Sequence, residues 1–306
     1  MTDTVKNRSE ILFIYDIRDG NPNGDPLDEN KPRIDEETGI NLVTDVRMKR
    51  TIRDYLHDFK TLGIFVREIV YDEQNMYIQD GKRRAKDFGE DPERILNECI
   101  DVRLFGGVIP LKGDSITYTG PVQFKMGRSL HRVSMKHIKG TGAFASKEGS
   151  KQATFREEDI LPYSLILFYG IINENAAKHT NLSDADVKLL LDGIWNGTKS
   201  LISRTKVGQV PRLLLKVNYS KENYHIGDLD RMVKLITEIP HENIRDTTDF
   251  QLDLSELIGK LASEKDSIKD IEICADERIK FSKDGVSFSI EELASSTGIA
   301  IKPIAF

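Results

Sequence analysis

The residues best suited to chemistry lie between positions 11 and 53. An apolar run, Ile11–Ile17, leads into a loop of turn-forming residues, Asp19-Gly-Asn-Pro-Asn-Gly-Asp-Pro26, and a helix with a basic face follows at 44–53. Glycine amides can approach a ligand closely, and the start of a helix adds a positive dipole end to the charge of its side chains. This combination predicts a site for a polyanion.

The loop partly resembles a calcium-binding EF-hand. Asp19, Asn21 and Asn23 fall at alternating ligand positions, and Gly24 lies at the required bend. The twelfth position should be a bidentate glutamate, and here it is Asn30. We therefore exclude calcium.

Two other ligands suit the loop. Its carboxylates could hold a catalytic magnesium ion for phosphodiester cleavage: Asp16, Asp19, Asp25 and Asp28. Alternatively, the side chains of Asn21 and Asn23 and the loop amides cradle a phosphate, which requires no metal and suits the basic helix that follows. We favour the phosphate site and expect neither a metal nor a cofactor.

The helix after the loop carries four cations. Lys49 and Arg53 share a face, Arg50 faces Asp54, and Arg47 lies near the N-terminus. A solvated charged face and a site for backbone phosphates both explain this pattern. The adjoining loop makes the phosphate site a reasonable expectation.

Two later segments also concentrate positive charge. Val122–Val133 interleaves aromatic, basic and hydroxyl residues and is followed by 141–147, so its rings could stack on bases: Phe124, His131 and Phe144. Exposed flexible hairpins have the same composition. Ser203–Arg212 combines Gly208 with three cations and is a candidate second phosphate contact.

Composition restricts the class of protein. The net charge of the 306 residues is −6, but residues 222–306 carry 18 acids against 10 Lys/Arg, and residues 1–221 carry 34 Lys/Arg against 32 acids. Asn196–Lys221 has six cations and no acid. Such local patches set the footprint for a phosphate chain. Neither a membrane span nor a signal peptide core is evident, and Cys99 and Cys274 are expected to be reduced thiols in a cytoplasmic protein.

The elements that would position these residues follow a β-α-β order twice. We predict strands at Ser9–Arg18, Phe65–Tyr71, Leu161–Ile172 and Pro211–Tyr219, with helices from Thr44 to Gly63 and at Ser183–Ile202. This order is typical of the ferredoxin-like fold of RNA-recognition modules, an α+β class. We expect a palm from residues 1–74 and 160–221, an insertion at 75–159, and an acidic C-terminal extension at 222–306 packed on the palm.

Five segments together resemble one family, the CRISPR-associated Cascade backbone subunits of the RAMP-like Cas seven group, in the branch of subtypes I-B and I-C. The resemblance covers roughly residues 9–220 and rests on Asp19–Pro26, Leu42–Arg53, Asp101–Gly106, Gly120–Phe124 with Gly127–Leu130, and Arg204–Gly208. It implies a hand-shaped protein with an RNA-recognition-like palm, fingers and a thumb hairpin. Copies would polymerise in a helical filament along a guide RNA, join other Cascade subunits, and present bases to target DNA in antiviral defence.

Carried onto this chain, the resemblance places the thumb at Phe124–Arg132 and Phe144–Lys147, and the finger region at Arg103–Gly106. With the residues above, the expected RNA contacts are Asn21, Asn23, Arg33, Thr44, Arg47, Lys49, Arg50, Arg53, Arg103, Phe105, Phe124, Arg128, Ser129, His131, Arg132, Phe144, Lys147, Arg204, Lys206 and Gln209.

The family members it resembles are not nucleases, so we expect no catalysis. Similar subunits of type III complexes cut target RNA with a loop aspartate, and Asp25 is the candidate for that alternative. A non-specific RNA-binding or purely structural assembly protein is the other alternative.

Overall fold

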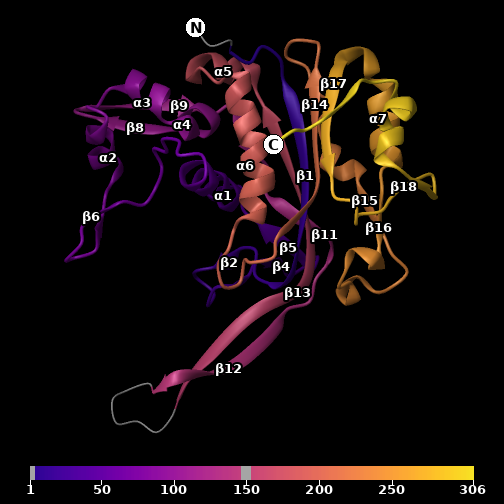
Figure 1. Ribbon diagram of the computed structural model, residues 1–306, viewed down its shortest axis with the longest axis horizontal. Coiled ribbons are helices and arrows are strands. Elements are labelled where there is room, and N and C mark those ends of the chain that lie inside the picture. Colours follow the sequence, from indigo (N-terminus) through magenta and orange to yellow (C-terminus); the bar gives the residue numbers. More distant parts are fainter. Residues whose placement is uncertain (1–3, 146–152) are drawn as a thin grey trace.

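The computed structural model describes residues 4–145 and 153–306, and its centre is one long mixed sheet (Figure 1). The sheet order is β20-β17-β14-β1-β13-β11-β5-β4, with β10 and β12 also paired to β13. Its strands are β1 (Ser9–Gly20), β4 (Ile34–Asp35), β5 (Ile40–Val43), β10 (Val122–Phe124), β11 (Gly127–Arg132), β12 (Lys136–Ala145), β13 (Ala153–Ile172), β14 (Val210–Tyr219), β17 (Ile268–Ala275) and β20 (Ile301–Pro303).

Strand β1 is central because it is buried on both faces. Every residue from Ser9 to Ile17 is buried, and the strand pairs antiparallel with both β13 and β14. Successive side chains of a strand point to opposite faces. Accordingly, Phe13 packs into one hydrophobic cluster, whereas Leu12 and Ile14 pack into another.

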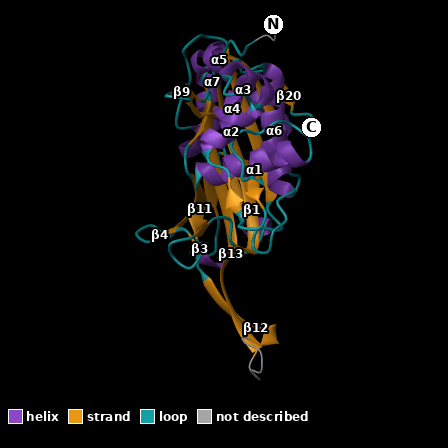
Figure 2. Ribbon diagram, turned by 90° about the vertical axis from the view of Figure 1, so that its left-hand side faces the viewer, coloured by secondary structure: helices purple, strands orange, loops and turns teal. Residues whose placement is uncertain are grey.

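Helices cover one face of the sheet (Figure 2). They are α1 (Asp45–Asp58), α5 (Glu174–Thr180) and α6 (Asp184–Lys199). α6 begins with a capping box between Ser183 and Asp186. A Cβ on Gly193 would lie 2.9 Å from Ile52, so α6 needs glycine where it crosses α1. This face therefore holds α1, and with it the basic residues of interest, firmly against the sheet.

The C-terminal part of the chain covers the other face. Its helices α7 (Ser255–Ser263) and α8 (Leu293–Thr297) contribute Leu257, Leu261 and Leu293 to the core beneath Leu12 and Ile14. A small sheet completes this layer, with strands β15 (Lys234–Ile236), β16 (Gln251–Asp253), β18 (Phe281–Lys283) and β19 (Val286–Phe288). Short 3-10 helices join them: η1 (Leu229–Met232), η2 (His241–Asn243), η3 (Thr247–Asp249), η4 (Lys265–Ser267) and η5 (Ile290–Glu292).

Two parts project from this body. A lobe beside α1, here called the finger region (residues 64–119), has its own core around Phe65, Phe88 and Ile95. It comprises α2 (Gly81–Asp87), α3 (Pro92–Glu98), α4 (Ile100–Phe105), the hairpin of β6 (Val70–Asp72) and β7 (Tyr77–Ile78), and the hairpin of β8 (Gly106–Leu111) and β9 (Asp114–Thr119). The other projection is the long hairpin of β12 and the first half of β13 (Figure 1).

The α+β class and most of the regular elements are confirmed, including the hairpin of β4 and β5 within Arg33–Val43. The strand predicted at Phe65–Tyr71 is wrong over most of its length. The amides of Phe65 and Val66 instead donate to Asp101 at 2.7 and 3.0 Å, which draws this segment into the finger region. β10 and β11 occupy the place beside β13, although they lie within the predicted insertion.

Two helical predictions also differ. The helix predicted at 229–239 is wrong, because η1 and β15 form there. In α1, Val46 and Phe59 were predicted to face inward, but they are 66% and 63% exposed, and Met48 is buried in their place. None of the helices in the described ranges is long and apolar enough to cross a membrane.

Candidate nucleic-acid interface

The loop after β1 is tied to the start of α1 by one asparagine. The Asn23 Oδ1 atom accepts hydrogen bonds from the Thr44 amide at 2.8 Å and from the Thr44 hydroxyl at 2.9 Å. Thr44 is the N-cap of α1, and its hydroxyl accepts from the Arg47 amide at 3.2 Å. Asn23 therefore fixes the loop against the positive end of the helix dipole. The short hairpin of β2 (Gly24–Asp25) and β3 (Lys31–Pro32) continues from it.

The same loop contacts the segment between α6 and β14. The Asn21 amide donates to the Thr205 carbonyl at 2.7 Å, and the Asn21 side-chain amide donates to the Asn30 carbonyl at 2.7 Å. A Cβ on Gly20 would lie 2.7 Å from the same Thr205 oxygen, so this close approach requires glycine. Residues 203–209 are thereby brought beside the Asn21 loop and α1. Sequence analysis selected all three segments but not the contact through Thr205.

Arg47 and Lys206 meet at this junction without a counter-ion. Within the described chain neither forms an ion pair, and Arg47 bonds only to the Thr51 hydroxyl, at 2.9 Å. Burial lowers the pKa of Arg47. Burial, and then the charge of Arg47, lower the pKa of Lys206. These two cations are partly desolvated and repel each other, which is the electrostatic state of a site that lacks its anion.

Two buried polar atoms of the same region are also unsatisfied. The Asn21 Oδ1 and Arg47 Nε atoms have no hydrogen-bond partner among the residues described. Such atoms are costly to bury unless a partner arrives. Together, Asn21, Arg47 and Lys206 form what we call the palm site.

The other predicted cations already have acidic partners. Their shortest ion-pair distances are 2.8 Å for Arg33–Asp25, 3.0 Å for Lys49–Asp45, 2.7 Å for Arg50–Asp54, 2.9 Å for Arg53–Asp101, 2.8 Å for Arg103–Asp186, 3.7 Å for Arg128–Asp35, 2.9 Å for Arg132–Glu242 and 3.1 Å for Arg204–Glu158. An exposed pair contributes little and opens readily towards a phosphate. The pairs of Arg53 and Arg103 are largely buried and join separate elements, so they hold the fold together.

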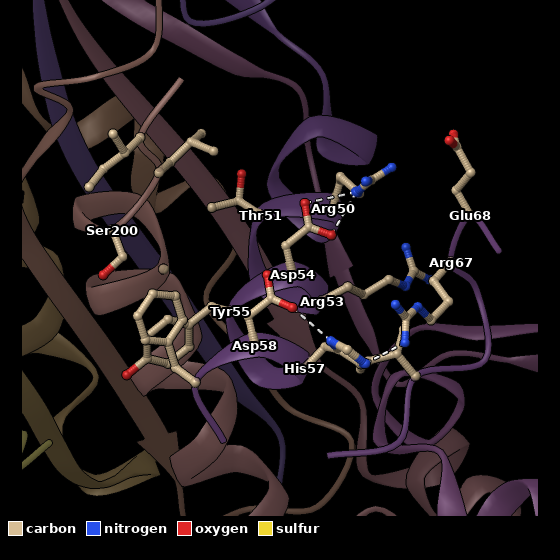
Figure 3. A pocket seen from close by; sticks show the side chains of 15 residues that line it. Arg50, Thr51, Arg53, Asp54, Tyr55, His57, Asp58, Arg67, Glu68 and Ser200 are labelled. Carbon is tan, nitrogen blue, oxygen red and sulfur yellow. Dashed lines mark hydrogen bonds and ion pairs between the residues drawn. The ribbon is translucent and has the colours of Figure 1, made fainter. Parts of the chain in front are cut away.

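The C-terminal half of α1 lines a cleft of about 350 Å³ (Figure 3). Its charges are neutralised within the cleft. Arg50 bonds to Asp54, His57 lies 2.7 Å from Asp58, and Arg67 donates to His57. This cleft is therefore a less suitable phosphate site than the palm site, although it is larger and lies on the same helix.

The aromatic residues predicted to stack on bases are buried in this conformation. Phe105 lies under the cations of Lys49 and Arg53, with distances of 5.8 and 5.1 Å to its ring centroid. Phe124 packs edge-on against Phe168. Their place in the palm core, with Phe124 on β10, explains why the expectation of an exposed, flexible hairpin at 122–133 is wrong.

The β11 residues are internal as well. His131 is 1% exposed, stacks on Tyr163, and accepts at Nε2 from the Leu165 amide. Burial lowers the pKa of His131. Ser129 and Gln209 are also buried, and each donates to a backbone carbonyl. Lys147 and the side chain of Phe144 lie outside the described residues.

The loop carboxylates do not converge on a metal site. Asp16 is buried and accepts from Tyr163 at 2.7 Å and from Arg212 at 2.8 Å. Asp25 accepts from Arg33 and from the Leu27 amide. No group of three or more His, Cys, Asp or Glu side chains could hold a metal ion in the part of the chain that the structure describes.

Comparison with known structures first defines a class of fold. One similar chain, from a "CRISPR RNA-guided surveillance complex", aligns with a TM-score of 0.56 and 13% identity over 97% of this chain and 94% of its own. Another, from a "CRISPR RNA-guided surveillance complex, pre-nicking", aligns with a TM-score of 0.54 and 10% identity over 95% and 99%. The fold is thus that of subunits found in such complexes.

The sequence then defines the family. The family model described as "CRISPR-associated protein Cas7" matches residues 7–255. The "CRISPR-associated protein Cas7" of Haloferax volcanii is 34% identical over 304 residues, 90% of this chain and 89% of the relative. The chain belongs to the CRISPR-associated Cas7 family, in agreement with the family resemblance of its motifs.

Proposed function

We propose that this protein is a backbone subunit of a CRISPR RNA-guided surveillance complex and that the palm site holds the phosphate chain of the guide RNA. The observation that carries the proposal is the pair of Arg47 and Lys206, which are partly buried, close together and without an acidic partner in the described residues. A phosphate neutralises both cations and removes their repulsion. Its oxygens also accept from the unsatisfied Arg47 Nε.

Binding of this kind reads the shape and charge of the guide, and it leaves base edges free to pair with target DNA. Further copies of the chain occupy successive stretches of the guide, and other Cascade subunits complete the complex. The exposed ion pairs of Arg50, Arg128, Arg132 and Arg204 open to phosphates farther along the strand. Arg53 and Arg103 have structural roles.

The test is to express the protein together with a guide RNA, purify the assembly, and measure the length of the recovered RNA before and after nuclease treatment. RNA of uniform length, protected at a regular interval, supports a guide-coating filament. RNA of random length and without a protected interval would contradict it. Repeating the experiment with Arg47→Gln plus Lys206→Gln shows whether retention depends on the palm site.

We further propose that the subunit does not cut RNA. Both carboxylate oxygens of Asp25 serve the loop itself: Oδ2 accepts from Arg33 at 2.8 Å and Oδ1 from the Leu27 amide at 3.0 Å. A metal-dependent endoribonuclease would have to release this carboxylate before the metal could bind it. The alternative therefore has a structural cost that the phosphate site does not have.

A further inference from the structure

The outer hairpin of the finger region presents an unusual apolar surface to solvent. Tyr71, Met76, Tyr77 and Ile78 are 42%, 66%, 55% and 51% exposed. The two tyrosine rings lie 6.2 Å apart and are tilted by 38°. An isolated two-stranded hairpin gains little stability by itself, so exposed rings on it indicate a binding surface. Figure 1 shows the hairpin of β6 at the far tip of the finger region, away from the central sheet.

Cations of α2 line the same surface. The Arg83 guanidinium lies 3.7 Å from the centroid of the Tyr71 ring. Lys82, Arg83 and Lys86 line an open cleft of about 360 Å³ together with Tyr71 and Ile78. All three cations are exposed, and none has an acidic partner within residues 4–145 and 153–306.

Most acids nearby are already engaged. Asp80, which also lines the cleft, caps α2 by accepting from the Arg83 amide at 2.8 Å. Asp72 accepts from two amides of its own turn, and Asp87 pairs with Arg84 at 3.0 Å. The charge of Lys82, Arg83 and Lys86 therefore remains available to an external anion.

We propose that this surface, made of Tyr71, Tyr77, Lys82, Arg83 and Lys86, binds single-stranded nucleic acid. Unpaired bases stack on the tyrosine rings while the strand's phosphates contact the three cations. Alternation of aromatic rings with cations is the usual chemistry of such sites. Lysine is depleted in protein–protein interfaces, so a protein partner suits the surface less well. The inference does not rest on the proposed function, because no residue is shared with the palm site.

The experiment measures fluorescence anisotropy of labelled oligo(dT) and oligo(U) with the full chain carrying Arg47→Gln and Lys206→Gln, so that the palm site contributes little. Tyr71→Ala plus Tyr77→Ala should weaken binding of the preferred strand by about tenfold, the effect of losing one good stacking contact. Tyr71→Phe plus Tyr77→Phe should restore it, because phenylalanine retains the stacking face. An abasic strand of equal length should bind the parent protein as weakly as oligo(dT) binds the alanine variant.

A charge-matched pair of variants tests the cations. Lys82→Ala plus Lys86→Ala should weaken binding and flatten its salt dependence, whereas Lys265→Ala plus Lys280→Ala, with the same change in net charge, should not. The two control lysines are exposed in the C-terminal layer, far from α2 in sequence. Equal binding by the tyrosine variants and the parent, or equal binding of the abasic strand, would overturn the proposal. So would a change in oligomeric mass with unchanged oligonucleotide affinity, since that result assigns the surface to contacts between copies.

Discussion

Replacing Arg47 and Lys206 together with glutamine should weaken guide binding without destabilising the fold. For single strands, each neutralised phosphate contributes about 0.7 to the slope of log K against log salt. If each cation meets one phosphate, the slope should become shallower by about 1.4. The assay is anisotropy of a labelled guide over a series of salt concentrations.

The stability side of this prediction follows from the pKa directions. The fold lowers the pKa of Arg47 and of Lys206, so the folded state holds these two protons less tightly than the unfolded state does. At neutral pH both groups are still charged, and their charge then opposes folding. The RNA-free double variant should therefore melt at the same temperature as the parent or at a higher one. Only the RNA-bound protein should lose stability.

The control has the same loss of charge elsewhere: Lys265→Gln plus Lys280→Gln should leave both the slope and the melting temperature unchanged. Two results would refute the reasoning. An unchanged salt slope in the palm variant would remove Arg47 and Lys206 from the interface. A large fall in its melting temperature would show that the two cations are structural and that a partner stabilises them in the free protein.

Three further predictions separate structural from binding roles. Arg53→Ala should cost about 3–5 kcal/mol of unfolding free energy, because Asp101 is fully buried and loses its counter-ion; urea titration checks this, and an intact melting curve would contradict it. Magnesium and labelled target RNA should give no cleavage with the assembled complex, and regularly spaced cuts abolished by Asp25→Ala would establish the nuclease alternative. Since burial lowers the pKa of His131, the unfolded state binds its proton more tightly, and stability should fall as pH drops below about 6.5. His131→Gln should show a weaker fall in melting temperature over that range.

Local signals explain the elements that could be predicted. The continuous apolar run of β1 and the Ser183 capping box of α6 are each contained within a few residues, so pattern and propensity suffice. β10 and β11 are different. Their membership of the central sheet depends on pairing with β13, about 40 residues farther along, which no local pattern encodes. The segment at 65–71 failed for the same reason, since its place is set by Asp101.

The candidate site shows the same division between local and distant information. The sequence selects the loop and the helix of cations, but it does not reveal which cation finds an acid. Arg53 pairs with Asp101 and Arg103 with Asp186, which are 48 and 83 residues away. Lys49 and Arg53 share a face as predicted, and that face lies on Phe105 and the finger region. Sharing a helix face therefore identified a structural pair of cations, not a binding pair.

Arg47 lacks a partner for a reason that can be traced to composition. Two residues along a helix correspond to about 200°, so Arg47 points away from the face of Lys49 and towards β14 and the segment before it. That segment belongs to Asn196–Lys221, a stretch with six cations and no acid. No carboxylate from this stretch can neutralise Arg47 or Lys206, whereas every other cation predicted in a described region lies within reach of one. The missing charge must then come from outside the chain, and a phosphate strand supplies it at regular intervals.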